Sequence, residues 1–366
     1  MSNHSRRDFL KSAAVAGAGL AWAKHLAADE TRSRPSKFHI RLGIDNFAVR
    51  AMNWKAPALV DYAASLKLDT LFITDLDAYE SLEPGYLESL RAKAAGNGLQ
   101  IIAGSWSICP TSKVFRKQWG TAKEHLALGI RVAQAVGSPV VRVILGNRED
   151  RLTEGGIQAR IRDTVKVCQA LRSRAIDAGV TIAVENHGGD MQAWELAQLV
   201  EEAGRDYVGV NLDSGNAVMT MEDPLASLEI LGPYTLATSL RDSAVWESAN
   251  GATFQWTAMG DGDLDLRQYF ERFAQLCPRV AVNIETISGS NREIPYLTEA
   301  FWKAYPQARA KDFARFLALA KRGKPREPVK FPEGPARAAA EQAFQKDQIE
   351  RSIRYCKETL GLGLKS

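Results

Sequence analysis

The chain has 366 residues, of which 45% are hydrophobic and 25% charged, and this composition is that of an ordinary globular protein with a large core. Its net charge of +4 comes from scattered lysines and arginines, so the sequence lacks the basic stripe of a nucleic-acid-binding protein. No CxxC spacing occurs among Cys109, Cys168, Cys277 and Cys356, which predicts buried thiols rather than zinc ligands or a disulfide framework.

The N-terminal segment is predicted to lie outside the fold. Arg6 and Arg7 precede DFLK and then the apolar run SAAVAGAGLAWA. At about a dozen residues, this run is too short to cross a bilayer as a helix. The segment resembles a twin-arginine export signal, which implies the twin-arginine export machinery as a partner and a periplasmic or otherwise exported location. We predict a signal peptide over residues 1–30, cleaved after Ala23 or Ala28, with an uncleaved membrane tether as the alternative.

Strand-like and helix-like segments then alternate along the chain. The strand-like runs are FHIRLGIDNF, LDTLFIT, LQIIAGSW, SPVVRVIL, VTIAVEN, YVGVNLD, TLATSL and RVAVNIE. Between them, apolar residues recur at three- and four-residue steps, as in amphipathic helices, and several helices end at a glycine such as Gly137 or Gly179. Eight such strands predict an α/β fold, a (β/α)8 TIM barrel over residues 36–290. An open doubly wound sheet is the alternative, but no glycine-rich turn follows the first strand.

The last part of the chain, residues 291–366, loses the alternation and is predicted to be a C-terminal helical extension packed on the barrel. EIPYLTEAFWKAYP and AKDFARFLALAKRG have helical patterns, KPREPVKFPEGP is a proline-broken linker, and AAAEQAFQKDQIERSIRYCKETLG is a final helix. Before this extension, ATFQWTAM is interpreted as a loop that can fold over the carboxyl ends of the strands, and GDGDLD as a loop with a helix N-cap.

Acidic residues end the last four predicted strands: Glu185, Asp213, Asp242 and Glu285. The chemistry of a barrel sits at the carboxyl ends of its strands, and alternation along the fifth strand places His187 on the same face as Glu185. Converging carboxylates repel one another and need a cation or a proton. Oxygen ligands suit Mg²⁺ or Mn²⁺, and a nitrogen ligand would extend the choice to Co²⁺ or Zn²⁺. Asp242 is equally well explained as a salt-bridged or capping residue.

The motifs AVENH, VNLDSGN, SLRD, GDGDLD and NIET resemble those of the sugar phosphate isomerase/epimerase superfamily, also called xylose isomerase-like TIM barrels, over roughly residues 38 to 320. In ketose 3-epimerases of this superfamily, one divalent metal is held by Glu, Asp, His and Glu, and the two glutamates form the acid/base pair. The resemblance implies that Glu185, Asp213 and Glu285 are metal ligands, and that Glu185 and Glu285 are catalytic.

The seventh strand departs from the family pattern. The usual His-x-Lys-Asp is replaced by Ser239, Leu240, Arg241 and Asp242, so the ligand histidine is absent. His187 and Gln255 are the candidates for the fourth metal ligand. The alternative is a degraded metal site in a chain that no longer catalyses.

The resemblance implies a metal-dependent isomerase or epimerase that abstracts the proton alpha to a carbonyl and forms an enediolate. No phosphate cradle is evident, so an unphosphorylated sugar, keto-sugar or glycoside is expected, with His187, Arg241, Trp106 and Trp256 binding it. The alternatives are a lyase or dehydratase acting by β-elimination and a non-catalytic exported carbohydrate-binding barrel. A nuclease is not expected, because only one of the five histidines can reach the site. Self-association into a homo-oligomer is left open.

Overall fold

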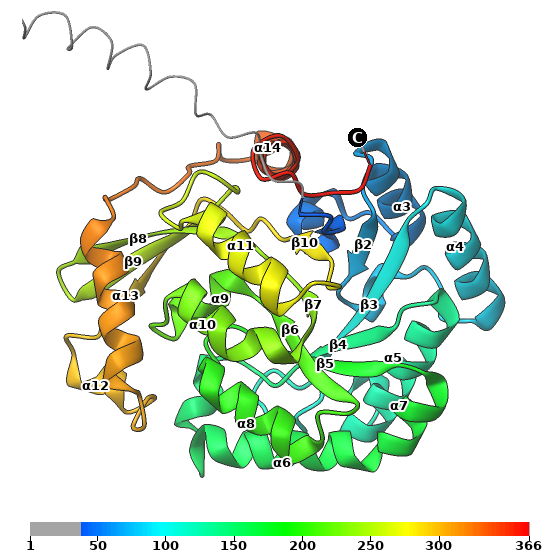
Figure 1. The fold of residues 1–366 in the computed structure, drawn as a ribbon, viewed down its shortest axis with the longest axis horizontal. Helices are drawn as coiled ribbons and strands as arrows, with labels where there is room; N and C mark the ends of the chain where they lie inside the picture. The colour runs from blue at the N-terminus through cyan, green and yellow to red at the C-terminus, as the bar shows by residue number, and fades with distance from the viewer. Residues whose placement is uncertain (1–37, 366) are drawn as a thin grey trace, which may run out of the picture. The chain divides into compact units, whose positions relative to one another are not determined.

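The computed structural model describes residues 38–365 and confirms the parallel (β/α)8 barrel (Figure 1). The barrel strands are β1 (Leu42–Asp45), β2 (Thr70–Ile73), β3 (Gln100–Ser107), β4 (Val140–Ile144), β5 (Thr181–Glu185), β6 (Val208–Leu212), β7 (Thr235–Thr238) and β10 (Val282–Ile284). Their order in the sheet is β10-β1-β2-β3-β4-β5-β6-β7. A parallel bridge between Leu240, which follows β7, and Ile284 of β10 joins the two ends of this order and closes the barrel. The predicted signal peptide lies outside the described residues.

The helices that follow the strands form the outer layer of the barrel. They are α3 (Ala56–Ser65), α4 (Pro84–Gly96), α5 (Ala122–Val136), α6 (Gly156–Ala170), α7 (Arg172–Ala178), α8 (Ala193–Ala203), α9 (Ser214–Met219), α10 (Pro224–Leu231) and α11 (Leu266–Leu276). Short 3-10 helices lie in the connections: η1 (Asn46–Met52), η2 (Leu76–Ala78), η3 (Lys117–Trp119), η4 (Arg148–Leu152) and η5 (Gly232–Tyr234). Local signals set the helix ends. Thr121 and Glu124 form a capping box at the start of α5, which ends at Gly137 with φ 74°.

The barrel interior is apolar towards the amino ends of the strands and polar towards their carboxyl ends. Alternate residues of β2 separate the two sides of the sheet, because Leu71 and Ile73 belong to the main core while Phe72 belongs to a small cluster. The other members of that cluster come from four further strands: Ile102, Val140, Ala183 and Ala237. The buried polar residues Arg142 and Glu185 follow Val140 and Ala183 of this layer by two residues along their strands.

A second, smaller sheet corrects one sequence prediction. The segment predicted to be a loop contains β9 (Gly251–Thr257), which pairs antiparallel with β8 (Asp242–Ser248) and with β11 (Asn291–Ile294). The signal for a strand was present in the sequence, because Ala252, Phe254 and Trp256 alternate and pack into one apolar cluster with residues of the C-terminal region. Asp265 caps α11, as predicted from GDGDLD, by accepting a hydrogen bond from the backbone N–H of Gln268.

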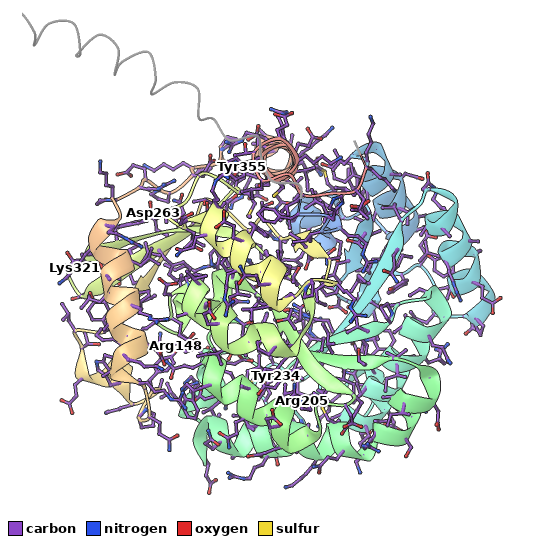
Figure 2. The ribbon with its side chains drawn as sticks, in the orientation of Figure 1. Arg148, Arg205, Tyr234, Asp263, Lys321 and Tyr355 are labelled. Carbon is purple, nitrogen blue, oxygen red and sulfur yellow. The ribbon has the colours of Figure 1, made fainter. Side chains whose placement is uncertain are left out.

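The residues after β11 form α12 (Glu299–Trp302), α13 (Ala310–Arg322) and α14 (Ala336–Glu358). Figure 1 shows α13 alongside β8 and β9. Asp263, labelled in Figure 2, accepts a hydrogen bond from Val245 N at 2.9 Å and lies 3.7 Å from the guanidinium of Arg326 in the linker before α14. Helix α14 contacts η1 through Gln345, whose side-chain oxygen accepts from Ala51 N at 2.9 Å. The predicted boundaries of the signal, barrel and extension stay predictions.

The described part of the chain also contains the four cysteines and all the helices named above. All four cysteines are buried and unpaired, as predicted. Within residues 38–365, none of the helices combines the length and the apolar character that crossing a membrane requires.

Candidate active site

A cavity of about 600 Å³ lies at the carboxyl ends of the barrel strands. The structure brings six of the predicted site residues to its wall: Trp106, Glu185, His187, Arg241, Trp256 and Glu285. Asp213 lies beneath this wall and Gln255 outside it. The side chains predicted at the strand ends therefore lie around one cavity. Their individual contacts determine what the site can do.

Glu185 is the last residue of β5 and is held by charged and neutral donors. Its Oε2 accepts from Arg142 Nε at 2.6 Å and from Asn211 Nδ2 at 2.8 Å, and its Oε1 accepts from Asn216 Nδ2 at 3.3 Å. Burial opposes ionisation of this carboxyl, but Arg142 and His187 outweigh it and lower the pKa of Glu185 below its ordinary value. Glu185 is therefore a carboxylate over the neutral pH range.

Asp213 acts first as a helix cap. Its Oδ1 accepts from the backbone N–H groups of Gly215 and Asn216, at 2.7 and 2.9 Å, which starts α9. Its Oδ2 accepts from the side-chain amide of Asn216 at 2.6 Å and contacts Arg241 Nη2. Burial raises the pKa of Asp213 to about 6, although Arg241 acts in the opposite direction.

Arg241 replaces the lysine of the family motif and links two of the acidic strand ends. Its Nη2 contacts both Asp213 and Glu285, and its guanidinium carbon lies 4.4 Å from the centroid of the Trp256 ring. The side chain is fully buried, yet its Nε and Nη1 have no hydrogen-bond partner among the described residues. Buried donors without partners are rare, so the hydrogen-bonding capacity of these two nitrogens is unused in this structure.

Glu285 follows β10 and has the opposite electrostatic character to Glu185. Burial raises the pKa of Glu285 well above its ordinary value despite the contact with Arg241, and the nearby Asp45, Asp213 and Glu185 add to the effect. The two glutamates therefore differ in proton affinity, because Glu185 is ionised while Glu285 tends to keep its proton. Such a pair, with pKa values moved apart, is suited to an acid and a base.

Ser239, which occupies the position of the family's histidine, is part of a buried network rather than a ligand. Its hydroxyl donates to Asp45 Oδ2 at 2.9 Å and accepts from Asn211 Nδ2 at 3.2 Å. Burial raises the pKa of Asp45 to about 7, although its backbone hydrogen bond from Phe47 and the nearby Arg142 and Ser239 act in the opposite direction. This network supports Glu185 from below through Asn211.

The predicted metal ligands are paired with arginines in this structure, and their role as ligands stays a prediction. Within residues 38–365, no group of three His, Cys, Asp or Glu side chains is arranged to hold a metal ion. The physical reason is that Arg142 and Arg241 take up carboxylate oxygens of Glu185, Asp213 and Glu285. A charge within an apolar strand marks Arg142 as unusual in the sequence, but no local pattern shows which carboxylate it pairs with.

Neither candidate for the fourth ligand fills the position of the missing histidine. Gln255 points away from the cavity, because its amide donates to Asn291 Oδ1 at 2.7 Å and to Glu327 O at 3.2 Å. This corrects its prediction as a ligand, which assumed that the β9 segment was a loop. His187 does line the cavity, with Nδ1 at 2.8 Å from Gly146 O, and this bond directs its other ring nitrogen away from that carbonyl. Its position is compatible with the predicted role in substrate binding.

Aromatic side chains form two parts of the cavity wall. Trp106 lies edge-to-face with His187 at a centroid distance of 5.6 Å, and the guanidinium of Arg116 lies 4.3 Å from the Trp106 ring centroid. On the other side, Trp256 is fixed by a 2.8 Å hydrogen bond from its Nε1 to Gly215 O. Both tryptophans line the cavity, as expected from the sequence. Their stacking on a sugar ring stays a prediction.

Sequence reasoning missed the concentration of arginines. Besides Arg241, the cavity is lined by Arg50, Arg116, Arg142 and Arg292. Arg292 has no ion-pair partner among the described residues, and burial together with Arg241 and Arg50 lowers its pKa to about 10. The only signal in the sequence was Arg142, a charge within the apolar run SPVVRVIL. The others come from segments that only the fold brings together.

Comparison with known proteins agrees with this geometry. The sequence profile described as xylose isomerase-like TIM barrel matches residues 60–303, more than half of the chain. The chain belongs to this family. Membership confirms the predicted fold and the predicted class, a sugar isomerase- or epimerase-like enzyme, whereas the reaction itself belongs to the proposal below.

Individual relatives are distant. The chain is 22% identical over 210 residues to the 3-oxo-isoapionate decarboxylase of Pectobacterium atrosepticum, a match that covers 57% of this chain and 69% of that protein. Among solved structures, a D-psicose 3-epimerase is similar with a TM-score of 0.57 and 12% identity, over 88% of this chain and 100% of the other. The IOLI protein with a bound zinc atom is similar with a TM-score of 0.53 and 16% identity, over 77% and 100%. At these identities, the structural matches show a common fold.

The N-terminus matches the twin-arginine translocation signal over residues 3–21, which confirms the predicted export signal. Because this route reads the arginine pair, replacing Arg6 and Arg7 together by lysine is expected to leave the protein in the cytoplasm. Fractionation of cells that express the two forms measures the effect, with a marker exported by the general secretory route as the control. Undiminished periplasmic protein from the double variant would contradict this assignment.

Proposed function

We propose that this exported enzyme is an isomerase or epimerase that moves a proton alpha to a carbonyl of an unphosphorylated sugar, keto-sugar or glycoside. The observation that carries the proposal is the presence of Glu185 and Glu285 in one cavity with pKa values shifted in opposite directions. The comparisons support the fold and the enzyme class, while the reaction and its substrate are our inference.

In this proposal the ionised Glu185 removes the proton from the carbon next to the carbonyl, because its carboxylate is oriented by Arg142 and Asn211. The electron pair of the broken C–H bond forms a C=C bond to the carbonyl carbon, and the π electrons of the carbonyl move to its oxygen, which becomes an enediolate oxygen. Glu285 holds a proton and returns one to the neighbouring carbon or to the opposite face. Burial of both carboxyls keeps water away from the intermediate.

The proposal contains no metal step. A divalent ion was predicted from the converging carboxylates and from the family resemblance, and one structural neighbour contains zinc. In this chain, however, the oxygens that would bind such an ion are engaged by arginines, as described above. The proton transfers are therefore derived from the side chains alone.

A lyase is a second candidate, and the arginines favour it. Arg50 and Arg292 line the cavity without an ion-pair partner among residues 38–365, and such cations suit a substrate carboxylate. A relative is by its name a decarboxylase, and a decarboxylase acts on a carboxylic acid. Loss of CO₂ from a 3-oxo acid leaves an enolate, the same kind of intermediate that proton removal produces. β-Elimination from a keto-sugar would also begin with this intermediate.

A single assay in D₂O separates these reactions. Candidate keto-sugars and 3-oxo sugar acids are incubated with the enzyme, and the products are followed by NMR and mass spectrometry. An isomerase or epimerase introduces solvent deuterium alpha to the carbonyl and conserves the mass of the skeleton. Release of CO₂, or of water with a new double bond, would identify a lyase instead. Turnover without any deuterium incorporation would contradict proton transfer through Glu185 and Glu285.

A further inference from the structure

The acidic ends of β6 and β10 converge on an atom of the protein itself. Asp213, directly after β6, and Glu285, directly after β10, both contact Nη2 of Arg241. Their oxygens therefore surround the position that a bound cation would have to occupy. Arginine keeps its charge at any pH a protein experiences, so this position holds a permanent positive charge.

The remaining donors of a metal site are also committed. Ser239 stands where an imidazole would be needed and donates its hydroxyl proton to Asp45. Both oxygens of Glu185 accept hydrogen bonds from Arg142, Asn211 or Asn216. A neutral serine hydroxyl is a poor metal ligand. The oxygens of Glu185 are placed for hydrogen bonds from a guanidinium and from amides.

The surroundings of Arg241 are fitted to its side chain. A Cβ at position 215 would collide with the aliphatic part of Arg241 and lie 2.7 Å from its Nε, so the glycine leaves the room that the arginine needs. Trp256 stacks on the guanidinium, and its own N–H is anchored on Gly215 O. The site is thus built around an arginine, and the unpartnered Nε and Nη1 leave donors for a ligand.

We propose that Arg241 takes the place of the divalent metal in this enzyme: its guanidinium contacts Asp213 and Glu285 where the ion would lie and donates hydrogen bonds to the substrate's carbonyl oxygen. This inference rests on the proposed function for its second part. As the C–H bond breaks and Glu185 takes the proton, the negative charge that forms on the carbonyl oxygen is stabilised by the N–H groups of Arg241. The proton returned to carbon collapses the enediolate, so no oxidant, reductant or added ion is needed.

The first test is a metal titration that needs no substrate. The wild-type protein is treated with EDTA, dialysed, and titrated calorimetrically with Mn²⁺, Co²⁺ and Zn²⁺ separately. We expect no stoichiometric binding, and no loss of turnover after EDTA treatment. Stoichiometric binding of any of the three ions, with turnover that depends on it, would overturn the proposal. Failure to turn over any sugar would instead count against the proposed function, because the titration stands without it.

A second test attempts to restore the metal site. The double variant Ser239→His with Arg241→Met recreates the Glu, Asp, His and Glu set without the resident cation, and is expected to bind one divalent ion. Ser239→His alone is the matched control and should bind none, because Arg241 remains in place. Equal metal affinity of the single and double variants would show that Arg241 does not occupy the cation position. Circular dichroism and thermal unfolding establish that each variant is folded. If the double variant does not fold, the metal titration of the wild-type protein alone tests the proposal.

A third variant addresses the donors. Arg241→Lys keeps a positive charge but loses the planar guanidinium with its Nε and Nη1 donors. Loss of an oxyanion donor typically costs ~10²–10³-fold in turnover, and we expect a reduction of that order with the fold retained. Full activity of the lysine variant would show that the charge alone is sufficient and would remove the donor role.

Discussion

Replacing either Glu185 or Glu285 by glutamine is expected to reduce turnover by about 10²–10⁴-fold, the usual contribution of a general acid or base. Glutamine keeps the size of the side chain and can still accept hydrogen bonds, but it can neither take up nor deliver a proton. Both glutamates are buried at the wall of the cavity. The measurement is steady-state turnover of a substrate found in the D₂O assay, together with deuterium exchange in each variant.

Glu222→Gln is the matched control for these two variants. Glu222 is also buried, and burial raises its pKa to about 8, so that a neutral side chain resembles its native state. It does not line the cavity, and the variant should retain wild-type turnover.

The pH dependence of turnover is a further check on the roles of Glu185 and Glu285. Activity should fall at acid pH, as the pH drops through the lowered pKa of Glu185, and again as the pH rises through the raised pKa of Glu285. Full turnover of either glutamine variant would remove that residue from the mechanism.

The largest effect on stability is expected at Arg151, far from the motifs. Its guanidinium forms a two-point ion pair with Glu195, at 2.7 and 2.9 Å, and donates to Asp190 O at 2.6 Å and Ala304 O at 2.5 Å. It thereby connects η4, α8 and the segment after α12. Arg151→Met would leave Glu195 charged and buried without its ion-pair partner, and breaking a buried pair in this way typically costs ~3–5 kcal/mol in the free energy of unfolding. Chemical denaturation measures the loss.

An exposed arginine–glutamate pair, also held by two hydrogen bonds, serves as the control. Arg272 and Glu229 also form a two-point contact, at 2.6 and 2.8 Å, but both side chains are more than one third exposed. Arg272→Met is expected to leave the free energy of unfolding close to that of the wild type, because water replaces the lost partner. Adding Glu195→Gln to Arg151→Met should recover part of the stability. Similar losses for Arg151→Met and Arg272→Met would show that burial does not determine the cost.

The sequence was sufficient for the barrel, because hydrophobic periodicity and helix-end signals are local. It also placed Glu185 and Glu285 on one rim, since parallel strands end at the same face. Two features escaped it for physical reasons. The β9 strand was read as a loop although its apolar residues alternate, because the residues on which this apolar side packs, such as Ile294 and Phe316, lie later in the chain. The pairing of Arg241 with Asp213 and Glu285 depends on which oxygens a flexible guanidinium reaches, and no local pattern specifies this.

The arginine between Asp213 and Glu285 also bears on how the protein becomes competent after export. Twin-arginine export carries proteins that are already folded, and an enzyme that uses a loosely held ion must be charged before departure or must compete for it outside. On the proposal above, the charge is part of the polypeptide and is delivered in a fixed ratio of one per chain. Scarcity of trace elements, or chelators released by neighbouring cells, would then leave this enzyme untouched while disabling relatives that depend on an ion.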